Sequence, residues 1–225
     1  MNEVRPFFRR QTIDRSLVFQ GLVFAYLLAG LAAFALYFGQ AVRWPGTAEM
    51  MPGGSFGPPY RLFAYLVGVV YLVSGAWVCL VRRAHPSGRA FTILAVSIAW
   101  VCAGLFDAYN TQQWTAGWTL ALALTGAGAV DLMLRFPQDD ALVGHFPPLT
   151  WLVYGLGLGL GAAALALGAQ PWLRGLATVF AALGLAGLAV WLRLRRMRLG
   201  STVDREQVRL MTWALMIALA PLGLW

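Results

Sequence analysis

Long apolar runs, each bounded by arginines, prolines or glycines, are the feature that most restricts how this chain folds. A run of about 20 apolar residues lets a helix cross the ~30 Å hydrocarbon core of a bilayer. Such runs occupy about residues 17–38, 62–81, 90–106, 115–134, 149–167, 175–192 and 210–225. The predicted fold is therefore all-α, a polytopic membrane helix bundle of about seven transmembrane helices.

The composition agrees with a membrane protein. Hydrophobic residues make up 60% of the 225 residues and charged residues only 12%. The net charge of +8 comes from arginines that lie between the apolar runs. This is the distribution that the positive-inside rule describes, so we expect a lipid bilayer and not a nucleic acid as the partner.

The arginines also predict an orientation. If residues 1–16 form a basic segment in the cytoplasm and the runs then cross alternately, 14 of the 17 arginines face the cytoplasm. These are Arg5, Arg9, Arg10, Arg15, Arg82, Arg83, Arg89, Arg135, Arg193, Arg195, Arg196, Arg198, Arg205 and Arg209. Only Arg43, Arg61 and Arg174 fall outside. We predict a multi-pass protein of the inner (cytoplasmic) membrane, with its amino terminus inside.

A polar stretch from Asp131 to Pro148 interrupts the apolar sequence. Charged side chains cross a bilayer at high cost and prolines end helices, so we interpret this stretch as a cytoplasmic hinge. Its first part consists of Arg135, Phe136 and Pro137. Asp131 lies four residues before Arg135, which predicts an ion pair within one helix end.

Alternating glycines mark the fifth apolar run as a packing surface. They provide two overlapping Gly-x-x-x-Gly faces, which let another helix backbone approach closely. These glycines are Gly155, Gly157, Gly159 and Gly161, and Gly184 and Gly187 extend the small surface in the sixth run. We expect the fifth and sixth runs to pack against each other. The alternative is a seam between two copies in a homodimer or in a larger membrane complex.

The densest charge in the chain lies between the sixth and seventh runs. The residues concerned are Arg193, Arg195, Arg196, Arg198, Arg205, Gln207 and Arg209. Arginines beside an anionic membrane surface gain ~1 kcal/mol each, so we expect this segment to bind anionic lipid headgroups. We predict that it acts as an output lever coupling the two helices. The alternative is that these charges only determine topology.

Motifs for catalysis, metals and cofactors are missing from the sequence. The two histidines, His85 and His145, fall in predicted loops, so two facing helices cannot hold a haem between them. No apolar run contains a charged residue away from its ends, which argues against ion-coupled transport. We expect no cofactor, no metal and no enzymatic activity in this chain.

Three short motifs carry a family resemblance. One is the run 132–137, which closes a span with Phe-Pro; a second is Arg82-Arg83, followed by a span that begins at 88–91. The third is the run 204–213, with Pro221 after it. Over roughly residues 62–225 the chain resembles the multi-helix membrane input region of bacterial sensor histidine kinases of the competence or quorum-sensing type.

The resemblance implies a sensory input module, in which Arg205 and Gln207 open the span that leads toward a transmitter. No transmitter, phosphoacceptor histidine motif or ATP site is present in these 225 residues. We therefore expect a non-catalytic input domain of a signal-transduction protein. The alternative is a non-catalytic integral subunit of a larger energy-transducing or photosynthetic membrane complex.

Overall fold

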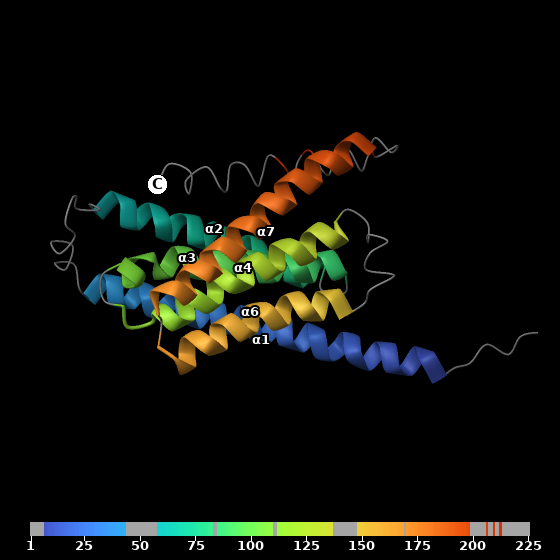
Figure 1. Ribbon diagram of the computed structural model, residues 1–225, viewed down its shortest axis with the longest axis horizontal. Coiled ribbons are helices and arrows are strands. Elements are labelled where there is room, and N and C mark those ends of the chain that lie inside the picture. The colour runs from blue at the N-terminus through green and yellow to red at the C-terminus, as the bar shows by residue number, and fades with distance from the viewer. Residues whose placement is uncertain are drawn as a thin grey trace, which may run out of the picture.

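The computed structural model is a bundle of helices that run back and forth roughly along one long axis (Figure 1). It describes residues 7–43, 58–82, 85–109, 112–136, 148–168 and 170–198, together with residues 206, 209 and 212. The helices are α1 (Phe7–Arg43), α2 (Pro58–Arg82), α3 (Pro86–Tyr109), α4 (Thr115–Arg135), α6 (Pro148–Ala166) and α7 (Pro171–Arg198). None of the described residues lies in a strand.

All six helices contain a stretch that is long and apolar enough to cross a membrane, so the chain is a multi-pass membrane protein. Each of the first six predicted spans corresponds to one of them, and the helices of the first and sixth spans extend well beyond the apolar run. The predicted seventh span, 210–225, lies outside the described residues except for Thr212.

Prolines determine where most of the helices start. Four of the six begin at a proline, namely Pro58, Pro86, Pro148 and Pro171. The proline ring presets a helical φ, and its missing N–H would have no partner in the first turn of a helix anyway. The prolines that interrupt the apolar sequence therefore also start the next helix after each connection.

α3 and α4 form the centre of the bundle. Within their apolar stretches 72% of the residues are buried, compared with 28–33% in α1, α2, α6 and α7. α3 packs against α1 and α2, α4 packs against α6 and α7, and the two central helices pack against each other. The outer helices expose large apolar side chains such as Val70, Trp77, Trp151 and Leu183, as a surface facing lipid tails does.

Small residues in α4 let its neighbours approach closely. Residues 121–129 are all buried. A Cβ added to Gly126 would lie 2.8 Å from the backbone oxygen of Phe180 in α7. A Cβ on Gly128 would lie 3.0 Å from the backbone nitrogen of Leu94 in α3. At both crossings the helices are so close that a side chain would force them apart.

The predicted glycine faces of α6 differ in their surroundings. A Cβ on Gly157 would lie 3.2 Å from the carbonyl oxygen of Ala123 in α4, and one on Gly161 would overlap the side chain of Leu120. Gly155 and Gly159 have no atom within 4 Å of an added Cβ. One Gly-x-x-x-Gly face therefore packs against α4, and the other points away from the bundle.

The fifth and sixth runs, which form α6 and α7, were expected to pack against each other. Instead, both pack against α4. α6 and α7 each pack mainly on α4 and touch each other little. A Cβ on Gly184 of α7 would lie 2.7 Å from the carbonyl oxygen of Gly126, and one on Gly187 would lie 3.7 Å from the sulfur of Met133. α4 lies between the two helices, and its small buried side chains let both of them pack closely against it.

Gly157 and Gly159 form a matched pair of substitution sites on one helix. Gly157→Leu pushes a side chain against the backbone of Ala123, and we expect it to lower the free energy of unfolding by ~1–3 kcal/mol. Gly159→Leu enters open space and should change it by less than ~0.5 kcal/mol. Thermal unfolding of both variants in one detergent measures this. Equal stability of the two variants would contradict the packing of Gly157 on α4.

Candidate functional site at the arginine-rich end

One end of the bundle gathers the described arginines of the inner loops. Here α2 ends and α3 begins, α4 ends and α6 begins, and α7 ends (Figure 1, right). The arginines on these helix ends are Arg82, Arg89, Arg135, Arg193 and Arg195. We call this the arginine-rich end.

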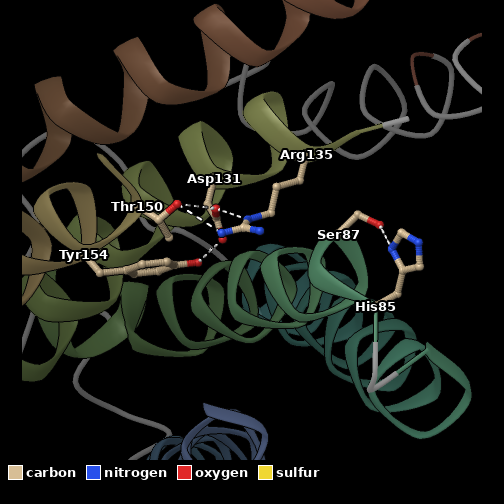
Figure 2. Close-up of polar contacts among 6 residues, drawn as sticks. All are labelled: His85, Ser87, Asp131, Arg135, Thr150 and Tyr154. Carbon is tan, nitrogen blue, oxygen red and sulfur yellow. Dashed lines mark hydrogen bonds and ion pairs between the residues drawn. The ribbon is translucent and has the colours of Figure 1, made fainter. Parts of the chain in front are cut away.

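A buried carboxylate lies at this end, between α4 and α6 (Figure 2). The side chain of Asp131 is only 3% exposed. Its Oδ1 accepts a hydrogen bond from Arg135 Nε at 2.6 Å, and its Oδ2 accepts one from the Tyr154 hydroxyl at 3.1 Å. Thr150 Oγ1 accepts from Arg135 Nη2 at 3.0 Å and lies 3.5 Å from Asp131 Oδ1, to which it donates. We call these four residues the Asp131 cluster.

The chemistry of the Asp131 cluster explains why a charge can be buried here. Burying a carboxylate without partners costs several kcal/mol in lost hydration free energy. Arg135 supplies the opposite charge, and the two hydroxyls fill the remaining acceptor sites. The predicted ion pair between Asp131 and Arg135 is confirmed. The pair also links two helices, because its hydroxyl partners Thr150 and Tyr154 belong to α6.

Local sequence positions each half of the Asp131 cluster. In α4 the spacing of four residues puts Asp131 and Arg135 on one face, just before the chain becomes extended at Phe136 (φ −113°, ψ 137°). In α6, which starts at Pro148, the same spacing aligns Thr150 and Tyr154. Neither Thr150 nor Tyr154 was predicted from the sequence. The one sequence signal for them was the spacing of two hydroxyl side chains, four residues apart, just after the predicted hinge.

Arg195 connects the end of α4 to α7. Its Nη1 donates a hydrogen bond of 2.9 Å to the carbonyl oxygen of Phe136, and its guanidinium lies 5.4 Å from the ring centroid of Trp191. The last carbonyls of a helix have no partner within the helix and attract cations. The predicted hinge and the predicted lever therefore meet in one contact, between residues 59 positions apart.

Two other predicted lever residues have described side chains, and neither is buried. Arg193 is exposed, and Arg209 forms an exposed ion pair of 2.8 Å with Glu206. Exposed pairs of this kind contribute ~0–1 kcal/mol. The side chains of Arg196 and Arg198, and the whole of Pro137, Arg205 and Gln207, fall outside the described residues.

A second buried carboxylate lies at the opposite end of the bundle. Asp107 of α3 is 1% exposed. Its two oxygens accept hydrogen bonds from the backbone N–H groups of Gln113 and Trp114, at 3.0 and 2.8 Å. These bonds hold the short connection between α3 and α4. Asp107 therefore has a local structural role and serves below as a control.

The metal-binding residue types and His85 can also be located in the structure. Within the described ranges no three His, Cys, Asp or Glu side chains gather where they could hold a metal ion. His85 lies in the turn before α3, where its Nδ1 is 2.9 Å from Ser87 Oγ (Figure 2). His145 falls outside the described residues.

Comparisons of this chain with protein-family models, with curated proteins and with solved structures found no match.

The Asp131 cluster makes a prediction about stability. Asp131→Asn leaves Arg135 without its counter-charge, so we expect the free energy of unfolding to fall by about 3 kcal/mol. Tyr154→Phe removes one hydrogen bond and should cost about 1 kcal/mol. Arg193→Gln, at an exposed position of the same end, is the control and should be neutral. Unfolding in detergent measures all three, and an Asp131→Asn variant as stable as the control would contradict the role of the ion pair.

Proposed function

We propose that this chain is the membrane-embedded input domain of a signal-transduction protein and is not itself catalytic. The observation that carries the proposal is the double connection at the end of α4. The Asp131 cluster joins α4 to α6, and Arg195 joins α4 to α7. An input domain needs an element that passes movement of its spans to a segment outside the membrane. α7 leads directly into the basic segment 193–209.

The mechanism we propose is a shift of α6 and α7 over the surface of α4. Both outer helices present apolar side chains to their surroundings, so a change in the bilayer or in the outer loops acts on them directly. They touch each other little, and therefore each can move separately. A shift of α6 moves Tyr154 and Thr150 away from Asp131 and Arg135, which leaves the α4 ion pair without its α6 partners. The end of α4 then moves, together with the Phe136 carbonyl that Arg195 binds.

The distribution of charge supports an input domain over a transporter. Within the described residues the buried carboxylates Asp107 and Asp131 lie at opposite ends of the bundle, and both have hydrogen-bond donors. A transporter needs such a group near the middle of the membrane. The resemblance to kinase input regions supports the same function, since the motif that closes α4 contains Arg135 and Phe136.

The proposed orientation places the arginine-rich end in the cytoplasm. In a background with Cys79 and Cys102 changed to Ser, His85→Cys should resist an impermeant maleimide in intact cells and react after permeabilisation. Gln113→Cys, exposed at the opposite end, should react in intact cells. Labelling of residue 85 in intact cells would overturn this orientation.

The coupling mechanism predicts that the Asp131 cluster sets the position of the α7 end. Spin labels at Arg82→Cys of α2 and Leu194→Cys of α7, in the same background and in lipid nanodiscs, report the distance between the two ends. We expect Asp131→Asn to shift or broaden the distance distribution. Asp107→Asn also removes a buried charge, but at the far end, and should leave the distribution unchanged.

Identical distributions in all three proteins would mean that the cluster is structural and would remove the support for an input domain. The stability of each variant, checked by thermal unfolding, separates coupling from general loosening. Purification from native membranes in a mild detergent tests the alternative. A stoichiometric pigment or redox protein in the preparation would favour a subunit of a larger membrane complex.

A further inference from the structure

α1 changes its neighbour along its length. Away from the arginine-rich end it packs against α2, where the Tyr65 hydroxyl donates a 3.1 Å hydrogen bond to the carbonyl oxygen of Tyr37. At the arginine-rich end it meets α6 instead. The ring centroid of Phe19 lies 6.0 Å from that of Trp151 and 6.5 Å from that of Tyr154. α1 and α2 therefore diverge toward the arginine-rich end, and α3, which packs on both, forms the floor between them.

A small cleft, with room for about one water molecule, opens where the two helices diverge, and we call it the α1–α2 cleft. It is lined by Gln20, Val23, Cys79, Arg89 and Thr92, which come from all three helices. The hydroxyl of Thr92 donates within α3 to the carbonyl oxygen of Gly88 at 3.0 Å. Arg89 is the cationic group in this wall.

Arg89 has no carboxylate of its own in the described part of the chain. Its Nε is buried without a hydrogen-bond partner, and its guanidinium lies 5.0 Å from the ring centroid of Phe19. Asp131 and Arg135 are both near enough to affect it electrostatically. Both oxygens of Asp131 are already bound by other groups, so two guanidiniums share one carboxylate. The site carries an excess positive charge beside an apolar groove.

We propose that the α1–α2 cleft binds one anionic phospholipid from the leaflet at the arginine-rich end. The phosphate contacts the planar guanidinium of Arg89, whose geometry suits phosphate oxygens. One acyl chain lies beside the cleft, along the exposed apolar side chains of α1 and α2 such as Leu22 and Leu80. A zwitterionic lipid fits worse, because its ammonium group adds a further positive charge near Arg89 and Arg135. This site is distinct from the segment 193–209 and does not depend on the proposed signalling role.

The test is lipid binding by native mass spectrometry of the purified full chain. Phosphatidylglycerol and phosphatidylcholine with the same acyl chains are titrated into delipidated protein. We expect one phosphatidylglycerol to bind with clear preference, and Arg89→Gln to weaken that binding at least tenfold. Arg82→Gln removes an exposed arginine from the same end and should leave it unchanged. Equal losses in the two variants would overturn the proposal, because they would indicate general attraction to the surface.

A second measurement on the unmodified protein distinguishes a lipid from a free anion and applies even if Arg89→Gln does not fold. Phosphatidylglycerol should raise the midpoint of thermal unfolding more than either phosphatidylcholine or inorganic phosphate at millimolar concentration. Equal shifts with inorganic phosphate would show that the acyl chain makes no contribution. Equal shifts with phosphatidylcholine would show that Arg89 does not select for charge. Either result would overturn the site.

Discussion

Close contact between helix backbones at α4 is the constraint on which the rest of this structure depends. Lipid tails are as apolar as leucine, so helices in a bilayer associate through tight packing and not through exclusion of water. Residues 121–129 of α4 are all buried and are mostly small. Gly126 and Gly128 admit the backbones of α7 and α3, and Ala123 lies against Gly157 of α6. α3, α6 and α7 therefore all pack closely against α4.

The polar contacts at the arginine-rich end connect α4 to each of its two outer neighbours, α6 and α7. α6 and α7 meet mainly through α4, so each packs on that helix with few contacts to the other. The Asp131 cluster holds α6 at one register, and the bond from Arg195 to Phe136 holds α7. A buried network of this kind is strong when every member is satisfied and costly when one is lost.

The two ends of the bundle satisfy their buried charges in different ways. Asp107 is bound by backbone N–H groups of the next few residues, so its environment forms with the turn itself. Asp131 has Arg135 on its own helix, but its two hydroxyl partners come from a second helix, so its environment is complete only when α6 is in place. Arg89 is a second cation near this carboxylate, and its Nε is buried without a hydrogen-bond partner. The arginine-rich end is thus the end where a buried charge depends on packing between helices.

The sequence by itself determined the class of fold, the first six spans and the ion pair between Asp131 and Arg135. Span length depends on bilayer thickness, and a spacing of four residues aligns side chains on any helix, so both are local properties. Tertiary structure alone decided that Gly157 and Gly161 face α4 while Gly155 and Gly159 face outward. A helix that is apolar on every side does not indicate which face turns inward. The partners of Asp131 in α6, and the bond between Arg195 and Phe136, arise only once α4 lies between the two outer helices.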